Sequence, residues 1–246
     1  MDLIVHNGIP ETPAANACDV MVLSAHPDDA EFGAAGSVIH WVDRGLRVVY
    51  AIATDGDKGS SDRSLSPEAL AAIRRKEQAQ AAESIGVSEI VYMGYPDQGL
   101  EDTPGLRKDV VRLLRIYRPR KMVTSDPYRR YLWHRDHRII GQVAMDAVYP
   151  FARDHMAYPD LLEEGLEPHK VAEILFWGAD EINHVMDVTN TFDRKIEALY
   201  KHASQMREFK STDPAEWLKG RCREMAQEQE ADFDLAEGFH RVVLPG

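Results

Sequence analysis

Short apolar runs alternate with longer amphipathic segments over most of this chain. The apolar runs are rich in β-branched residues, lack helical periodicity and predict buried strands at 19–25, 47–54, 89–95, 121–125 and 173–179. The longer segments predict helices at 33–45, 67–85, 104–117 and 137–149. Strands that alternate with helices of this length pair in parallel through right-handed crossovers. The pattern therefore predicts an α/β fold, a Rossmann-like three-layer α/β/α arrangement with a mostly parallel sheet.

Local signals at the ends of these segments support the predicted bounds. Ser66 is a favourable N-cap, Pro67 suits the first helical position, and Glu68 places an acid in the first turn. After residue 190 the tail predicts further helix, best formed over 195–208. No internal repeat, low-complexity run or interdomain linker interrupts the sequence, so we expect one domain over residues 1–246.

Composition narrows the range of partners and compartments. The 246 residues are 44% hydrophobic and 28% charged, which is ordinary for a globular protein. The formal net charge of −12 argues against nucleic acid or an anionic membrane surface as a partner. The two cysteines, Cys18 and Cys222, make no disulfide framework, which favours a reduced compartment. Because the N-terminus lacks a basic signal segment and no apolar run is long enough to span a bilayer, we expect a cytoplasmic protein without membrane insertion.

Polar clusters follow four of the predicted strands. The first strand leads into His26–Glu31, the second into Thr54–Gly56, the third into Tyr95–Asp97 and the fourth into Asp126–His137. In an open parallel sheet the carboxyl ends of the strands meet at one edge, and ligands bind there. The sequence therefore predicts that all four clusters lie on the same rim of the sheet.

Two of these clusters hold residues suited to a catalytic zinc ion. Such an ion needs three protein ligands and an open position for water. His26 and Asp29 lie three residues apart in one loop and can face one point, and His137 from the later loop completes the set. Asp28 cannot readily bind the same ion as its neighbour, so it is the candidate general base for the attacking water.

Two residues beside the later ligand are candidates for supporting roles. His134 lies three positions before His137 and should project into the same site. Asp136 is expected to orient an imidazole from outside the ligand set, and we assign it to His134.

Each cluster also has a plainer interpretation. The 26–29 run could be a polar turn with a helix cap, and the 134–137 run could be a solvated charged loop. Glu31 is favoured in a first helical turn by the helix dipole alone, so we interpret it as structural. His202 could equally be structural. Because both clusters follow strands on the same rim, a metal site is favoured over two unrelated polar loops.

The motifs in these clusters resemble those of the PIG-L/LmbE-like zinc-dependent N-deacetylases. The resemblance rests on AHPDDAEFGAAG at 25–36 and on HRDH at 134–137 followed by Arg138 and Gly141. Further support comes from AIRRKE at 72–77, GYPD at 94–97, and DVT with a later lysine and His-x-Ser-Gln over 187–205. The loop after the second strand and the AIRRKE helix are most similar to the diacetylchitobiose deacetylase branch.

The resemblance implies an activity and a role for each matching residue. It implies hydrolysis of the acetamide of an N-acetylglucosamine-type sugar, with Zn²⁺ or another divalent metal, and a homo-oligomer, a trimer or a hexamer. The family's ligand pattern falls on the same three positions. His134 would stabilise the oxyanion or protonate the leaving amine. Arg74 would contact the substrate, and Asp97 would bind sugar hydroxyls.

One residue departs from the family's pattern, and three alternatives stay open. Arg135 stands where the family commonly has proline, and we expect it to point away from the metal toward an anionic partner, Asp126 being nearest in sequence. The first alternative is an amidase acting on a glucosaminyl thiol or antibiotic-precursor conjugate. The second is a nucleotide-binding Rossmann-like module, against which the first turn argues because it carries carboxylates and lacks GxGxxG. The third is a non-catalytic sugar-binding protein, against which both intact motifs argue.

Overall fold

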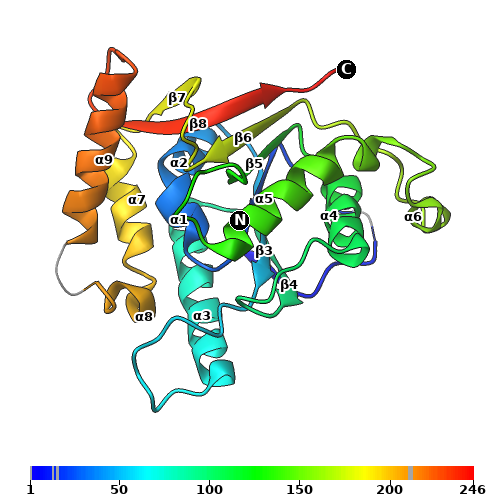
Figure 1. Cartoon of the computed structure of the whole chain (residues 1–246), viewed down its shortest axis with the longest axis horizontal. Helices are drawn as coiled ribbons and strands as arrows, with labels where there is room; N and C mark the ends of the chain where they lie inside the picture. Colours follow the sequence, from blue (N-terminus) through cyan, green and yellow to red (C-terminus); the bar gives the residue numbers. More distant parts are fainter. Residues whose placement is uncertain (1, 13, 15–16, 210–212) are drawn as a thin grey trace.

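The strands of this computed structural model form one sheet, most of it parallel (Figure 1). The structure describes residues 2–12, 14, 17–209 and 213–246, and in that part of the chain eight strands lie in the order β1-β4-β3-β2-β5-β6-β8-β7. Their bounds are β1 (Ile4–Asn7), β2 (Val20–Ser24), β3 (Val48–Thr54), β4 (Glu89–Tyr95), β5 (Lys121–Ser125), β6 (Glu173–Trp177), β7 (His184–Asp187) and β8 (Ala236–Val243). Only β8 runs antiparallel to its neighbours, β6 and β7. The α/β prediction is confirmed.

Helices cover both faces of the sheet. Their bounds are α1 (Asp29–Gly33), α2 (Ala35–Asp43), α3 (Pro67–Ile85), α4 (Pro104–Tyr117), α5 (Arg135–Val148), the 3-10 helix η1 (Phe151–Arg153), α6 (Pro159–Glu163), α7 (Phe192–Leu199), α8 (Ala203–Met206) and α9 (Pro214–Glu228). One core joins α4 and α5 to the sheet, and the other joins α2, α3 and α7 to the opposite face. This arrangement has the three predicted layers.

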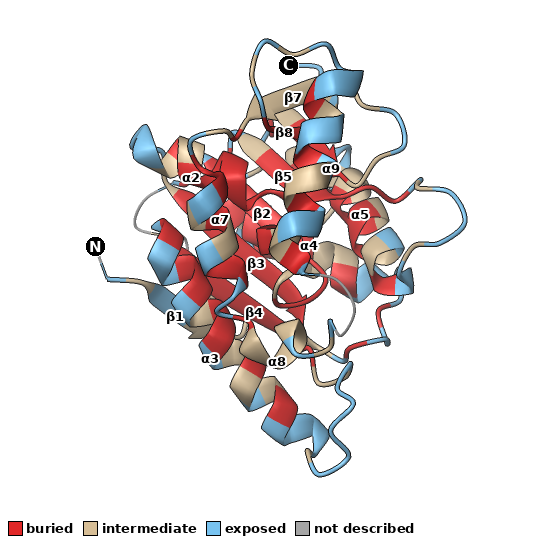
Figure 2. Cartoon of the chain, turned by 90° about the vertical axis from the view of Figure 1, so that its left-hand side faces the viewer, coloured by how far each residue is buried: buried red, intermediate tan, exposed pale blue. Residues whose placement is uncertain are grey.

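Successive side chains of the central strands point to opposite faces, so one sheet contributes residues to both cores. Met21 and Leu23 pack toward α4 and α5, while Val20 and Val22 pack toward α2 and α3. Successive side chains of a strand point to opposite faces, so a strand covered on both faces is apolar throughout. The whole of β2 and β3 is accordingly buried, as the red interior of Figure 2 shows.

Several predicted bounds agree closely with the structure, and two differ for local reasons. The Ser66 hydroxyl accepts a hydrogen bond from the backbone N–H of Ala69 and begins α3 as predicted. The helix predicted at 33–45 is α2, over 35–43, and a further helix that was not predicted, α1, precedes it over 29–33. Ala34 separates the two, because its φ of −149° is not helical. The helix predicted from residue 137 begins two residues earlier, at Arg135, because His134 is its N-cap.

The prediction that the tail is helical throughout was wrong. Residues 236–243 form β8, which lies within the sheet between β6 and β7. Its buried positions lie in its first half, at 236, 237 and 239, and Glu237, His240 and Arg241 interrupt the apolar pattern. Glu237 is nevertheless only 4% exposed, because Lys195 pairs with it inside the protein.

The topology brings the predicted polar clusters together. β4, β3, β2 and β5 are consecutive neighbours and all run parallel, so their carboxyl ends meet on one rim. In the described part of the chain, no helix is both long and apolar enough to cross a membrane.

Candidate metal centre and catalytic site

Three side chains from two loops converge on one point of the rim. His26 follows β2, Asp29 begins α1, and His137 lies in the first turn of α5. His26 Nδ1 lies 3.3 Å from His137 Nε2 and 3.5 Å from an Asp29 carboxylate oxygen. The other Asp29 oxygen lies 2.9 Å from His137 Nε2. The predicted ligand atoms therefore face one another in a tripod.

The size of this tripod fits a divalent metal ion. Ligands at about 2.0–2.1 Å from a tetrahedral ion are separated by about 3.3–3.4 Å. Two observed separations are close to that edge length: 3.3 Å between His26 Nδ1 and His137 Nε2, and 2.9 Å between His137 Nε2 and Asp29 Oδ1. The 3.5 Å separation from His26 Nδ1 is to the other oxygen, Asp29 Oδ2. Two imidazoles and one carboxylate are also the donor types that catalytic zinc uses. The residues present therefore fit the ion that the sequence predicts.

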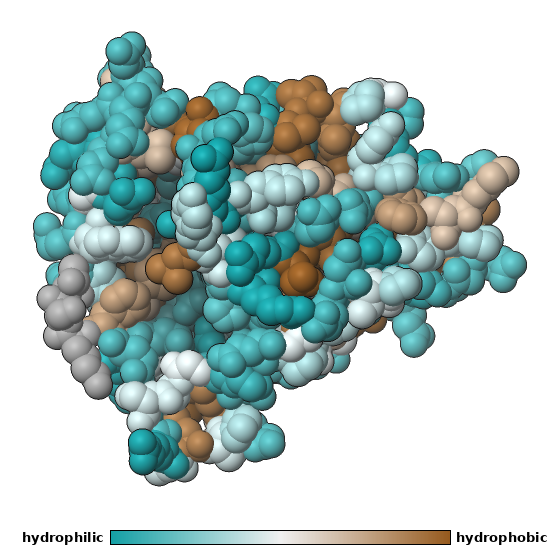
Figure 3. Space-filling view, viewed as in Figure 1, coloured by the Kyte–Doolittle hydropathy of each residue, from teal (hydrophilic) through white to brown (hydrophobic). Residues whose placement is uncertain are grey.

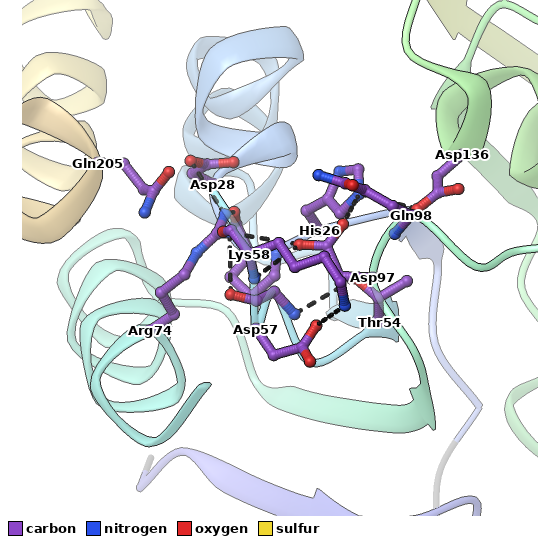
Figure 4. Close-up of polar contacts among 12 residues, drawn as sticks. His26, Asp28, Thr54, Asp57, Lys58, Arg74, Asp97, Gln98, Asp136 and Gln205 are labelled. Atoms are coloured by element: carbon purple, nitrogen blue, oxygen red, sulfur yellow. Dashed lines mark hydrogen bonds and ion pairs between the residues drawn. The ribbon is translucent and has the colours of Figure 1, made fainter. Parts of the chain in front are cut away.

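Two carboxylates fix the orientation of the His26 ring (Figure 4). The Nε2 atom of His26 lies 3.2 Å from Asp136 Oδ2 and 3.1 Å from Asp97 Oδ1. A proton on Nε2 serves these acceptors and leaves the Nδ1 lone pair facing the tripod. Burial acts to lower the pKa of His26, but hydrogen bonds with Asp136, Asp29 and Asp97 outweigh it and raise that pKa.

The Asp136 carboxylate therefore orients a different imidazole from the expected one. Its Oδ2 lies 3.2 Å from His26 Nε2 and accepts a hydrogen bond from the Gln98 backbone N–H at 2.7 Å, whereas its hydrogen bond with His134 comes from its own backbone N–H. The expectation that it orients His134 was wrong. The cause is the helix turn, because only the backbone N–H of Asp136 points toward His134.

Both oxygens of the Asp97 carboxylate also have partners within the protein. It is 5% exposed, one oxygen faces His26, and the other accepts a hydrogen bond from the Lys58 backbone N–H at 3.2 Å. Its predicted role in binding sugar hydroxyls is untested. In the structure it is an acceptor beside the ring of His26, which is predicted to bind the metal.

Asp28 stands apart from the tripod in an unusual backbone conformation. Its φ is +91°, and it is the N-cap residue of α1. The Asp28 carboxylate faces Arg74, whereas the Asp29 carboxylate faces His26 and His137, so the two neighbours point to different partners. Burial raises the pKa of the Asp28 carboxyl to about 6, against the opposing effect of the Arg74 guanidinium. A carboxylate with a pKa near neutrality suits general base catalysis.

The structure distinguishes the two arginines of α3. Arg74 is 4% exposed and donates hydrogen bonds to the carbonyl oxygens of Pro27, Gly56 and Lys58, with Asp28 Oδ2 3.3 Å from its Nη2. Arg75 points outward, toward Asn7 and Asp55. Arg74 thus joins the loops after β2 and β3 beside the candidate base. A contact between Arg74 and substrate remains a prediction.

His134 borders the tripod on its open side. Its ring lies 4.7 Å from the His26 ring and 5.2 Å from the His137 ring, centroid to centroid. Its Nδ1 accepts the backbone N–H of Asp136 at 3.1 Å, so a neutral His134 ring carries its proton on Nε2. Burial and the two neighbouring imidazoles lower the pKa of His134, which keeps this ring neutral. It is therefore a hydrogen-bond donor at the site.

Arg135 points away from the tripod, as expected, but its partner differs. Its guanidinium lies 2.8 Å from the Glu101 carboxylate and donates a hydrogen bond to the Leu100 carbonyl oxygen. Asp126, the expected partner, instead accepts a hydrogen bond from the Tyr128 backbone N–H. Arg135 occupies the first position of α5, where proline is also favourable.

A buried network behind Asp28 was missed by the sequence analysis. The Asp28 backbone N–H donates to Gln78 Oε1 at 2.9 Å, and Gln78 Nε2 donates to Glu31 at 3.0 Å. The second Glu31 oxygen lies 3.2 Å from His202 Nε2. Glu31, Gln78 and His202 are each at most 1% exposed. The only sequence signal for Gln78 is its position one helical turn after Arg74, on the same face of α3.

Lys195, from the motif at 187–205, and Glu237 of β8 hold the segment that contains α1 and the start of α2. Lys195 donates to the Phe32 carbonyl oxygen and to Glu237, each of which it approaches within 2.9 Å. The Glu237 carboxylate also accepts the backbone N–H groups of Gly36 and Ser37 at the start of α2. These contacts hold α1 and α2, and hence Asp29, against the sheet.

Comparison with known proteins gives consistent matches. The PIG-L family, described as GlcNAc-PI de-N-acetylase, matches residues 21–148. A diacetylchitobiose deacetylase from Thermococcus kodakarensis is 32% identical over 189 residues, covering 77% of this chain and 70% of that protein. A probable N-acetyl-alpha-D-glucosaminyl L-malate deacetylase 2 from Bacillus anthracis is 28% identical, covering 83% of this chain and 93% of that protein. The structure of an N,N'-diacetylchitobiose deacetylase from Pyrococcus horikoshii superposes with a TM-score of 0.84 and 31% identity, covering 94% of this chain and 86% of that one.

Proposed function

This chain belongs to the PIG-L family, and we propose that it is a metal-dependent deacetylase that hydrolyses the acetamide of an N-acetylglucosamine-type sugar. The products are acetate and the free amine. The observation that carries the proposal is the tripod of His26, Asp29 and His137, whose ligand atoms are 2.9 to 3.5 Å apart beside a carboxylate that is not part of it. The named activities of the relatives support the substrate class.

Each residue around the tripod has a proposed task. His26, Asp29 and His137 would hold a divalent ion, which would supply Lewis-acid chemistry for the amide carbonyl and for a water molecule. Asp28 accepts the proton of the attacking water, and Arg74 holds this carboxylate in place. His134 donates its Nε2 proton in a hydrogen bond to the carbonyl oxygen as negative charge develops there. Asp97 and Asp136 keep the His26 ring in the orientation that presents Nδ1.

Zinc is the metal we propose for the site. Two imidazole nitrogens and one carboxylate oxygen form the three-ligand set that zinc hydrolases use, and this set leaves a fourth position open. Softer ions select thiolate ligands, and the tripod contains no thiolate.

The remaining assignments also stand as proposals. We propose that residues 1–246 form one deacetylase domain and that the protein acts in the cytoplasm, which the two buried free cysteines favour. Assembly into a trimer or hexamer rests on the family resemblance alone.

Acetate release from purified protein tests the proposed function. N-acetylglucosamine, N,N′-diacetylchitobiose and an N-acetylated amino acid are assayed with and without prior chelation. We expect acetate from the sugars only, loss of activity after chelation, and recovery when zinc is restored. Absence of acetate from every sugar, with one metal ion bound per chain, would refute the proposal.

A further inference from the structure

A cavity of about 820 Å³ lies beside the tripod. It begins at Asp29 and His137 and extends toward α9, where Trp217 and Met225 form its far wall. Figure 3 shows this face of the molecule hollowed left of centre, with apolar surface on the walls of the hollow. Pockets of this size enclose ligands much larger than an acetyl group.

The near wall of the cavity is aromatic and packs directly on backbone. Trp177 covers Gly33, where an added Cβ would lie 2.6 Å from the indole. Trp133 covers Gly178 in the same way, at 2.9 Å. Each glycine thus lets an indole lie directly on the backbone, and Trp133 also donates a hydrogen bond to the Asp126 carbonyl oxygen. The Arg129 guanidinium stacks on the outer face of Trp133, 4.6 Å from the ring centroid.

The far wall is apolar as well. Met225 lies over Gly238 of β8, where an added Cβ would approach the sulfur to 2.5 Å. Trp217 is 49% exposed, so its indole presents apolar surface to the cavity.

Three of the charged side chains that line the cavity form ion pairs within the protein. Lys195 and Glu237 pair with each other at 2.6 Å, and Arg221 lies 3.2 Å from Glu224 on the same helix. A sugar ring placed against the indole and thioether surfaces would find no hydrogen-bond partner on those surfaces, and unpaired hydroxyls are costly. An apolar group, in contrast, gains burial against indole and thioether surface.

We propose that this cavity binds an apolar aglycone of an N-acetylglucosamine conjugate. The inference rests on the proposed deacetylation, because it takes Asp29 and His137 as the site where the acetamide reacts. The acetyl group is small, so the volume serves the other end of the substrate. The preferred substrate class is therefore an N-acetylglucosaminide with an alkyl or aryl aglycone, in preference to a free disaccharide.

A glycoside series tests the inference. Acetate release is measured for the methyl, butyl, hexyl and phenyl β-glycosides of N-acetylglucosamine and for N,N′-diacetylchitobiose. We expect kcat/KM to rise by up to about fourfold per methylene until the cavity is filled. Equal kcat/KM across the glycosides, with acetate still released, would overturn the inference and leave the proposed deacetylation standing. A gain with longer N-acyl chains, and none with longer aglycones, would also overturn it.

Substitutions on α9 test whether the dependence of kcat/KM on aglycone length arises from this cavity. Met225→Glu places a carboxylate in the far wall, and Trp217→Ala removes its indole. Both should lower the hexyl-to-methyl ratio of kcat/KM at least tenfold. Gln227→Glu, an exposed position on the same helix outside this cavity, is the matched control and should keep the wild-type ratio. A ratio unchanged in Met225→Glu would overturn the inference.

A binding measurement separates the cavity from catalysis. Hexyl β-glucoside has no amide to cleave, and its binding is followed by tryptophan fluorescence. We expect saturable binding that Met225→Glu weakens at least tenfold and Gln227→Glu does not. Saturable binding without acetate release from any glycoside would refute the proposed deacetylation but support the binding of an apolar group in the cavity. Absence of binding would overturn the inference.

Discussion

The side chain of Gln78 offers a test of how the candidate base is held. The Asp28 backbone has a φ of +91°, which is uncommon for a residue other than glycine and costs about 1–3 kcal/mol. Gln78 accepts the Asp28 N–H at 2.9 Å and donates to Glu31 at 3.0 Å, and it is 1% exposed. Gln78→Met keeps the length and the helix propensity of the side chain and removes both hydrogen bonds.

The loss of stability follows from the two bonds. Removing the acceptor leaves the partly buried Asp28 N–H without a partner, and removing the donor takes a hydrogen bond from the buried Glu31 carboxylate. Together these losses cost about 2–4 kcal/mol. In a chain of this size that cost lowers Tm by about 5–15 °C.

The loss of activity follows from the position of Asp28. Without the Gln78 acceptor its backbone can relax, and a displacement of about 1 Å at a catalytic group lowers the rate by up to about 100-fold. The metal should stay bound, because Asp29 is held separately by the backbone N–H of His26 at 2.8 Å and by His137.

The assay measures Tm, metal content and kcat for Gln78→Met and for Gln80→Met. Gln80 lies on the same helix and is exposed, so the same substitution there is the matched control. We expect a lower Tm and at least a tenfold lower kcat in Gln78→Met alone. Equal Tm and kcat in the two variants would refute the reasoning. A lower Tm with wild-type kcat, measured well below Tm, would show that Gln78 does not position Asp28.

Four further substitutions test the assigned roles. Asp28→Asn tolerates positive φ, so the metal should stay bound while kcat falls by about 10²–10⁴; metal analysis showing an empty site would transfer the ligand role to Asp28. His137→Ala should abolish stoichiometric zinc, and wild-type zinc content would place the site elsewhere. His134→Ala should lower kcat and kcat/KM alike by about 10²–10³, whereas a change in KM alone would make it a binding residue. Arg135→Pro should keep metal, kcat and stability within about 0.5 kcal/mol; loss of all activity with metal bound would reveal an unassigned catalytic role.

The fold was predictable where local signals and tertiary packing agree. β5 and α4 occupy the predicted residues, because each lies in the interior with apolar positions at the period of its own structure. β8 was missed, because it carries charged residues that only a distant partner stabilises. The cost of burying the Glu237 carboxylate inside the sheet is offset by its ion pair with Lys195. The two residues lie far apart in the sequence, so the sequence alone does not predict this pair.

The site was predictable only as far as short motifs reach. His26, Asp29 and His137 lie in runs whose residue types indicate a metal site, and the structure brings these three together. The residues that hydrogen-bond to these predicted metal-binding side chains come from other loops. Which residues they are therefore depends on the order of the strands in the sheet. Asp136 was therefore assigned to the wrong imidazole, and Gln78 was not considered.

The charge distribution of the rim gives a physical reason for a cation at the tripod. Four carboxylates, those of Asp28, Asp29, Asp97 and Asp136, lie around one small volume, and Arg74 is the permanent cation among the residues described there. Buried carboxylates are costly unless positive charge compensates them. Arg74 offsets one of the four negative charges. A divalent ion in the tripod would offset two more, and the imidazoles could then remain neutral as ligands. The arrangement that is costly without an ion is thus the one that gives the rim its affinity for a divalent cation.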